Sequence, residues 1–201
     1  MKKEFSFLVM LLFVGLTNVI AQTAPVFNNS RPEEHLEFKG IEITGTIDNV
    51  IEKLKKAGYT LAEKDEDGAV LDGTFANEDC QLLVSLTPKT KKVYSISVFF
   101  NKKDSWYSLK ADYKELKQSL KNKYDIRPDD DEFFIDPYYE GDGYELQALR
   151  LSKCIYRSKY ELNDGEITLA ILSNRIVLIY EDKKGDEINE REKSQNAYDD
   201  L

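Results

Sequence analysis

The chain has 201 residues and a formal net charge of −9, and its length suits one compact domain, or two small domains packed together, with a sizeable core. Its acidic balance argues against nucleic acid and anionic lipid as partners, because phosphate groups are bound by clustered lysine and arginine. We therefore expect no DNA-binding, RNA-binding or membrane-surface role.

Residues 1–21 are predicted to be a cleavable signal peptide. Two lysines near the N-terminus precede the largely apolar run Phe7–Leu16, and Ala21 supplies a small residue at the cleavage position. The apolar run is too short for a transmembrane anchor, which needs about 20 residues. A lipoprotein needs cysteine at the first mature position, where this chain has Gln22. We therefore expect a periplasmic or secreted protein without a membrane anchor.

The first expected elements follow a flexible lead-in, residues 22–35, which lacks a sustained apolar period. Residues 36–43 predict a strand with an irregularity at Gly40. Thr46 suits the N-cap of an amphipathic helix, and Gly58 suits its C-terminal end. A meander of four short strands is expected next, with turns at 67–68 and 88–90 and clear alternation in 80–87 and 93–101.

The clearest predicted helix comes after this meander. Its apolar residues recur at steps of three or four and therefore lie on one face. They are Trp106, Leu109, Tyr113, Leu116, Leu120 and Tyr124. We interpret this stripe as the face that packs on a sheet.

The segment 125–145 breaks the periodic pattern and mixes acidic with aromatic residues. Strands are expected again at 149–162, 166–172 and 175–181, with a tight turn at Ser173-Asn174 between the last two. The charged residues 183–201 contain few apolar side chains and are expected to fray as a tail.

These elements predict an α+β protein in which two helices pack on a mostly antiparallel sheet. One domain, residues 36–182, holds all of them. The order of an aromatic residue, an acidic turn and an alternating strand occurs at 74–84 and again at 159–169. This echo is the basis for dividing the domain into two tandem helix-plus-meander units, 36–101 and 102–182.

The element order over most of the mature chain resembles the β-lactamase-inhibitor-protein-like architecture, in which tandem helix-plus-sheet units join their sheets. That resemblance implies a concave sheet face for a partner, and it assigns no interface residue because no motif matches position by position. The chain is also similar to uncharacterised exported proteins of gram-negative gut anaerobes at Ala21-Gln22, at His35–Ile41, at Thr46 and at Leu71–Phe75. That likeness implies export and no particular activity.

Cys80 and Cys154 are the only cysteines. An oxidising compartment permits a disulfide between them, which would close a loop of about 75 residues and stabilise the protein by about 4 kcal/mol in the chain-entropy model. Cys80 also begins an alternating apolar set, so a buried free thiol explains it equally well. Both alternatives stay open at this point.

The acidic segment 125–145 is the best candidate for a partner-binding loop. Aromatic side chains supply contact area at a modest entropy cost, and neighbouring acids steer a basic partner. The predicted contacts are Phe133, Phe134, Tyr138 and Tyr139. The alternative is a solvated connection whose aromatic side chains pack onto the sheet.

The same segment also suggests a calcium site. Calcium prefers six to eight oxygen ligands, and four carboxylates lie near two glycines: Asp136, Glu140, Asp142 and Glu145. Their spacing does not match an EF-hand loop. A calcium-responsive protein is therefore the second hypothesis, and no other cofactor is expected.

No grouping of residues in the sequence predicts catalysis. His35 is the only histidine and is expected to be an edge-strand residue, and no Gly-x-Ser-x-Gly elbow, P-loop or dinucleotide fingerprint occurs. Two carboxylates of 129–145 would suit glycoside hydrolysis only if a cleft held them together. The sequence therefore favours a non-catalytic module that binds a protein or a peptide.

Overall fold

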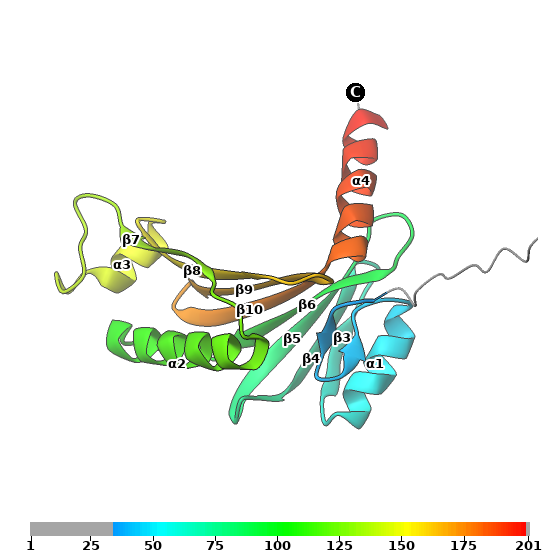
Figure 1. Ribbon diagram of the computed structural model, residues 1–201, viewed down its shortest axis with the longest axis horizontal. Coiled ribbons are helices and arrows are strands. Elements are labelled where there is room, and N and C mark those ends of the chain that lie inside the picture. Colours follow the sequence, from blue (N-terminus) through cyan, green and yellow to red (C-terminus); the bar gives the residue numbers. More distant parts are fainter. Residues whose placement is uncertain (1–33, 200–201) are drawn as a thin grey trace, which may run out of the picture. The chain divides into compact units, whose positions relative to one another are not determined.

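The computed structural model describes residues 34–199, so the predicted signal peptide and most of the lead-in lie outside the described residues. Figure 1 shows the helices and strands of residues 34–199, coloured in chain order. The protein is 30% helix and 40% strand, with a large antiparallel sheet, which confirms the predicted α+β class. Four helices occur in the described range, where the sequence predicts two. None of these helices is long and apolar enough to cross a membrane.

The first helix and its meander follow the predicted order. Helix α1 spans Ile47–Lys56 after an extended Thr46, and it buries the apolar side chains Ile47, Val50, Ile51 and Leu54 on one face. Gly58 has a φ of +98°, a conformation that glycine adopts without steric cost, and it follows the end of the helix. The four strands that follow are β3 (Thr60–Lys64), β4 (Gly68–Phe75), β5 (Glu78–Leu86) and β6 (Val93–Phe100).

The strand expected at residues 36–43 is instead a short hairpin. Strand β1 (Glu37–Phe38) pairs with β2 (Ile41–Glu42) in a separate two-stranded sheet. The two connecting residues, Lys39 and Gly40, have positive φ values of 52° and 76°, which are typical of a tight turn between antiparallel strands. The hairpin contributes Phe38 to the buried core.

The second half begins with α2 (Trp106–Tyr124), the predicted second helix. Its strands are β7 (Asp129–Phe134), β8 (Cys154–Glu161), β9 (Gly165–Leu172) and β10 (Arg175–Asp182). Strand β7 lies in the segment expected to be irregular, and helix α3 (Glu145–Arg150) includes the first residues of the strand expected at 149–162. Ser173 and Asn174 form the predicted turn, with φ values of 50° and 64°.

The C-terminal residues differ most from the prediction. The charged tail expected to fray at 183–201 is helix α4 (Lys183–Asp199) in the structure. Glu192 of this helix is buried, and its carboxylate accepts hydrogen bonds from the backbone N–H groups of Lys89 (2.6 Å) and Thr90 (3.1 Å) in the β5–β6 turn. Tertiary contacts therefore stabilise a helix that its apolar-poor sequence does not reveal.

The eight-stranded sheet joins the two halves of the chain. Its order is β3-β4-β5-β6-β10-β9-β8-β7, so the last strand of each half lies at the centre, where Val98 of β6 pairs with Leu178 of β10. Each half contains a helix followed by four strands, with α3 inserted in the second half. This order is compatible with the division into 36–101 and 102–182, while a true internal duplication stays a prediction.

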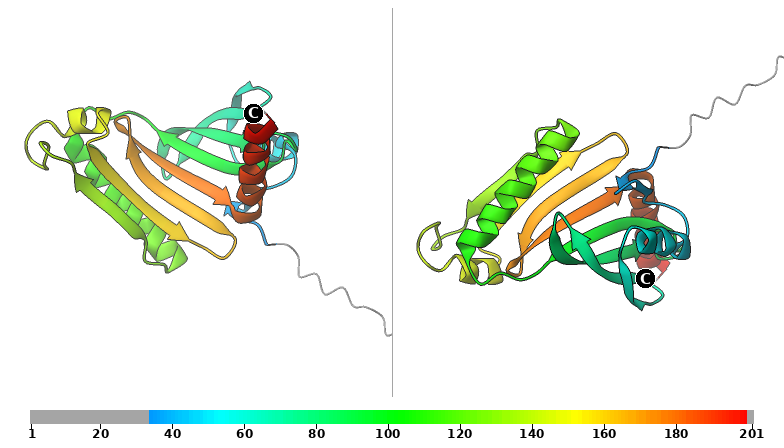
Figure 2. Two further views of the ribbon diagram at one scale, coloured as in Figure 1. Left: turned by 90° about the horizontal axis from the view of Figure 1, so that it is seen from above. Right: turned by 90° about the horizontal axis from the view of Figure 1, so that it is seen from below.

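The two faces of this sheet differ in what covers them (Figure 2). Helix α1 contacts β3 and β4, and α2 contacts β9 and β10. A row of completely buried residues crosses five strands on the helix-covered face: Leu82, Val98, Leu178, Leu169 and Ser158. On the other face no described helix crosses the middle of β7–β10, and α4 lies at one end (Figures 1 and 2). We call this second face the open face.

Candidate functional site

The four predicted aromatic contacts do not form one surface. Phe133 on β7 and Tyr139 in the loop after it are exposed, with 45% and 64% of their surface accessible. The Phe134 ring packs edge-on against Trp106 with 5.5 Å between centroids. Tyr138 is half-buried against the core, and its hydroxyl accepts a hydrogen bond from α3. Phe134 and Tyr138 are therefore partly buried against the helices, and the role of the four residues as partner contacts stays a prediction.

Two of the four predicted calcium ligands hold the backbone of their own loop. Asp142 accepts hydrogen bonds from the N–H groups of Tyr139 (3.1 Å) and Tyr144 (2.7 Å). Glu145 accepts one from the N–H group of Gly141 (2.8 Å). These carboxylates act as local caps of a turn, a common use of acidic side chains in loops.

The other two carboxylates of this set point elsewhere. Glu140 forms an ion pair with Lys110 of α2, and this contact holds the pKa of Glu140 below its usual value. Asp136 is exposed. Within residues 34–199, no three potential ligands lie close enough together to hold a metal ion. Calcium binding therefore stays a prediction without an assembled site.

Of the two alternatives left open for Cys80 and Cys154, the structure has the free thiols. Both cysteines are free and buried, and three strands separate β5 from β8 in the sheet. At about 4.8 Å per strand, the two residues lie on the order of 19 Å apart across the sheet. A disulfide needs Cα atoms within about 7 Å of each other, so the alternative of buried thiols describes both residues.

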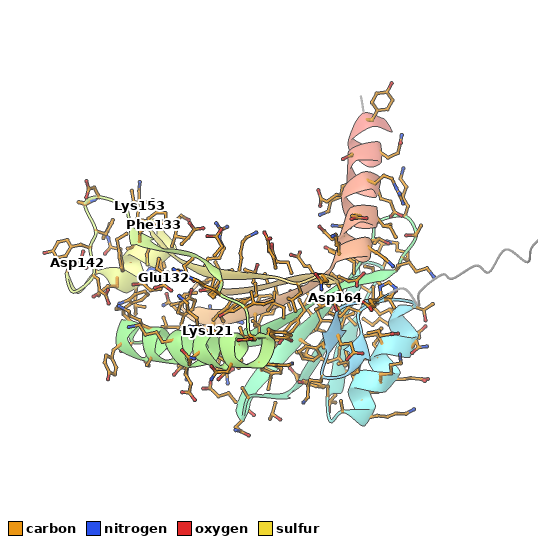
Figure 3. All side chains as sticks on the ribbon, in the orientation of Figure 1. Lys121, Glu132, Phe133, Asp142, Lys153 and Asp164 are labelled. Atoms are coloured by element: carbon orange, nitrogen blue, oxygen red, sulfur yellow. The ribbon has the colours of Figure 1, made fainter. Side chains whose placement is uncertain are left out.

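An apolar row crosses the open face near the ends of β7, β8 and β9. Phe133 of β7 pairs with Ile155 of β8. Strand β8 also pairs with β9, where Arg157 lies opposite Ala170, and the alternation of side chains places Ile155 and Leu172, each two residues from this pair, on the same sheet face. Leu172 is 50% exposed and Ile155 is half-buried. We call Phe133, Ile155 and Leu172 the apolar row, and Figure 3 shows its Phe133 on the side of β7 away from α2.

Apolar and charged side chains border this row. Ile135 is exposed beyond the end of β7, where its N–H group donates a hydrogen bond to the carbonyl oxygen of Lys153 (2.8 Å). Two residues further along β7 and β8, on the same face, Asp131 forms an ion pair with Arg157. An apolar strip with a polar border has the anatomy of a small protein-binding patch.

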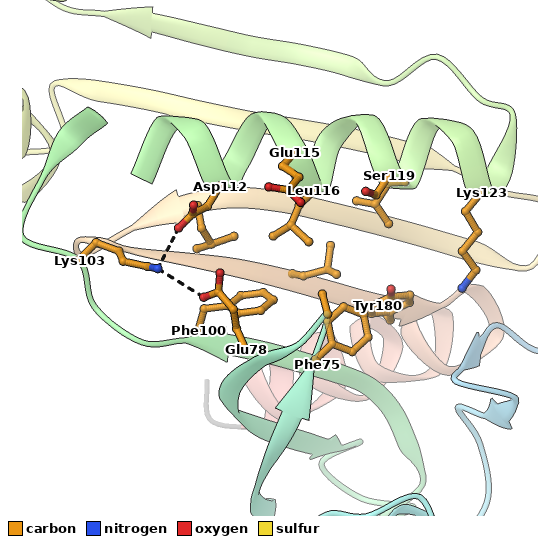
Figure 4. A pocket seen from close by; sticks show the side chains of 14 residues that line it. Phe75, Glu78, Phe100, Lys103, Asp112, Glu115, Leu116, Ser119, Lys123 and Tyr180 are labelled. Atoms are coloured by element: carbon orange, nitrogen blue, oxygen red, sulfur yellow. Dashed lines mark hydrogen bonds and ion pairs between the residues drawn. The ribbon is translucent and has the colours of Figure 1, made fainter. Parts of the chain in front are cut away.

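A cleft of about 260 Å³ opens on the opposite, helix-covered face, between α2 and the turn that joins β4 to β5 (Figure 4). Its floor includes Phe100 of β6 together with Ile176 and Leu178 of β10. The floor is apolar because these side chains point to the same face as the core. None of the residues predicted as site residues lines this cleft.

A group of three charged residues closes one end of the cleft. The Lys103 ammonium lies 3.0 Å from the Asp112 carboxylate and 3.4 Å from that of Glu78. The Asp112 carboxylate is the main cause of the raised pKa of Lys103, so this lysine is charged at neutral pH. The group connects the first turns of α2 to the start of β5 (Figure 4).

A partly buried polar network lies between α2 and the strands β7 and β8. The hydroxyl oxygens of Tyr113 and Ser158 are 2.6 Å apart, the Ser158 hydroxyl donates to Asp130 (2.6 Å), and Asp130 pairs with Lys117 (2.8 Å). Burial raises the pKa of Tyr113 far above its usual value. Because Ser158 is completely buried, the network attaches α2 to the sheet and does not present a nucleophile.

His35 has a structural partner that the sequence does not suggest. Its Nδ1 atom lies 3.1 Å from both carboxylate oxygens of Asp182. Asp182 is 1% exposed, and it also accepts hydrogen bonds from the N–H groups of Leu36 and Gly185, each 2.9 Å long. His35 precedes β1 and is not the edge-strand residue expected from the sequence.

The fold and these two surfaces define a class of protein: an α+β protein with a helix-covered sheet face that contains a cleft and an open face that carries an apolar row. Comparison of the chain with protein-family models, with curated proteins and with solved structures gives no match. The likeness to the β-lactamase-inhibitor-protein-like architecture and to exported proteins of gut anaerobes stays a prediction from the sequence.

Proposed function

We propose that this chain is an exported, non-catalytic binding protein that docks a protein or peptide partner on the apolar row of its open face. The observation that supports the proposal most directly is the exposure of Phe133 and Leu172 on a sheet face that no described helix crosses at its middle. Soluble proteins expose contiguous apolar patches mainly where another molecule binds. The predicted signal peptide, residues 1–21, supports export.

The form of the row favours a macromolecular partner. Small ligands occupy concave pockets, whereas the row is a strip of side chains on three neighbouring strands. Phe133 supplies the kind of aromatic anchor that protein interfaces commonly use. The formal net charge of −9 favours a partner with a basic surface around its apolar contact.

The test compares partner capture by the native protein and by a Phe133→Ala, Leu172→Ala double variant. Tyr107→Ala is the control, because Tyr107 is an aromatic residue on α2 that is even more exposed than Phe133 and lies outside the apolar row. Envelope and secreted proteins captured by each variant are measured by quantitative mass spectrometry, and the affinity of the leading partner is then measured with purified proteins. We expect an affinity loss of at least tenfold for the double variant and no change for the control. Equal affinity of all three proteins would overturn the proposal.

A further inference from the structure

The mouth of the cleft carries three polar side chains in one line along α2. Glu115, Ser119 and Lys123 all line the cleft, and their spacing of four residues places them on the same side of the helix. Figure 4 shows them along the edge of α2 above the apolar floor. With a rise of about 1.5 Å per residue, Glu115 and Lys123 are separated by about 12 Å along the helix axis.

The charges at the two ends of this line have no partner of opposite charge. Lys103, the other lining cation, already pairs with Asp112 and Glu78. Within residues 34–199, Glu115 makes no ion pair or hydrogen bond, and Lys123 meets only the face of the Tyr124 ring, at 4.8 Å. The mouth therefore presents one carboxylate and one ammonium group, both accessible, over an apolar floor.

We propose that the cleft binds a short apolar peptide of three or four residues with free termini. The peptide amine lies at Glu115 and the peptide carboxylate at Lys123. An extended chain advances about 3.3–3.6 Å per residue, so three or four residues span the distance between these two side chains. Alternate side chains of an extended peptide point the same way, which directs them onto the floor formed by Phe100, Ile176 and Leu178.

Charge balance favours this zwitterionic ligand over an amphiphile with a single charge. A fatty-acid anion would use Lys123, leave Glu115 unpaired and be repelled by the net charge of −9. A cationic amphiphile would use Glu115 and leave Lys123 unpaired. A peptide with free termini has no net charge and pairs with both side chains, while the hydroxyl of Ser119 between them binds a peptide backbone group.

Isothermal titration calorimetry with the tetrapeptide Ala-Leu-Ala-Leu tests the proposal. Three forms are compared: the free peptide, the N-acetylated peptide and the C-terminal amide. The free peptide binds with a stoichiometry of one, and each blocked form binds at least tenfold more weakly. Lys123→Gln removes the preference for the free carboxylate alone, and Glu115→Gln removes the preference for the free amine alone.

The control is Lys121→Gln, because Lys121 is an exposed lysine on the same helix that does not line the cleft; it leaves all three affinities unchanged. Glu115 and Lys123 are exposed, so their glutamine variants keep the fold, and circular dichroism verifies this. Absence of peptide binding, equal affinity of free and blocked forms, or tighter binding of decanoate than of the peptide would each overturn the proposal. The apolar row lies on the other face, so the Phe133→Ala, Leu172→Ala variant keeps its peptide affinity whether or not the row binds a partner.

Discussion

The carboxylate of Asp182 joins parts of the chain that are distant in sequence. It lies directly before α4 and accepts a hydrogen bond from the N–H group of Gly185, the third residue of that helix, which is the geometry of an N-cap. The same carboxylate contacts His35, 147 positions away. Because Asp182 is buried, these contacts replace water as its source of hydrogen bonds. One side chain therefore both begins α4 and holds the segment before β1.

We expect Asp182→Ala to lower the free energy of unfolding by about 2 kcal/mol or more. The loss combines a missing N-cap, which costs about 1 kcal/mol, with buried N–H groups left unsatisfied, which cost about 1–3 kcal/mol. Urea unfolding followed by circular dichroism measures the change. Glu187→Ala, at an exposed position of the same helix, is the control and should change stability by less than about 0.5 kcal/mol. Equal stability of the two variants would contradict this role for Asp182.

The contact between α4 and the β5–β6 turn depends on the ionised form of Glu192. Burial alone would raise the pKa of this carboxyl, but hydrogen bonds from Thr90 and from the N–H groups of Lys89 and Thr90 outweigh burial and lower it from 4.5. A carboxyl group whose pKa is lower in the folded than in the unfolded state stabilises the folded protein at pH values above the unfolded-state pKa. That stabilisation is lost as the pH falls below 4.5 through the folded pKa.

We therefore expect Glu192→Gln to destabilise the protein at pH 7 and to have a smaller effect at pH 3, where the native carboxyl is becoming protonated. Urea unfolding of both proteins across this range measures the difference in free energy. Glu187→Gln on the same helix should show no such pH-dependent difference. A stability difference that is the same at pH 7 and pH 3 would show that the charge of Glu192 is not what docks α4.

The elements that the sequence predicts well are those whose signals are local. Helix α1 begins after Thr46, which holds the N-cap position without a side-chain capping hydrogen bond, and it ends before Gly58, while α2 has a long apolar stripe. Strand β7 and helix α4 are not predicted from the sequence, because acidic strands and charged helices have no apolar periodicity. Strand β7 forms because β8 pairs with it, as in the contact of Asp129 with Lys159, and α4 forms because the β5–β6 turn binds Glu192.

At the scale of the whole molecule, the position of each cysteine in the strand order decides its chemistry. Cys80 lies on β5 and Cys154 on β8, so the sheet itself keeps the two thiols apart. Burial raises the pKa of Cys80 to about 11 and that of Cys154 to about 12. Because the thiolate is the reactive form, both side chains should be inert in the folded protein.

We expect the protein, purified without reductant, to show almost no reaction with a thiol reagent at pH 8 in the native state. In guanidinium chloride the unfolded protein should react with two equivalents of the thiol reagent per chain, since both thiols become accessible. The measurement is a spectrophotometric thiol titration combined with intact mass. A mass two units lower with no thiol reactivity after unfolding would reveal a disulfide and contradict the strand order.

The candidate sites also divide between local and tertiary causes. The sequence identifies Phe133 as a candidate contact because it stands among acidic residues, but only the pairing of β7, β8 and β9 places it on one sheet face with Ile155 and Leu172. The cleft has no sequence signal, since its mouth comes from α2 and its floor from β6 and β10. No local pattern brings Glu115 and Lys123 over Phe100.

What the sequence by itself determined is the α+β class, the positions of α1 and α2 in the chain, and the turn at Ser173-Asn174. Periodicity, capping and turn chemistry act between neighbours in the chain, and such signals are legible in one sequence. The tertiary structure alone decided the strand order, the helical state of residues 183–199, the separation of the cysteines and the division into an open face and a cleft. These features depend on pairings between distant residues, such as Val98 with Leu178. Such pairs contribute to stability only when the folded chain brings the two residues together.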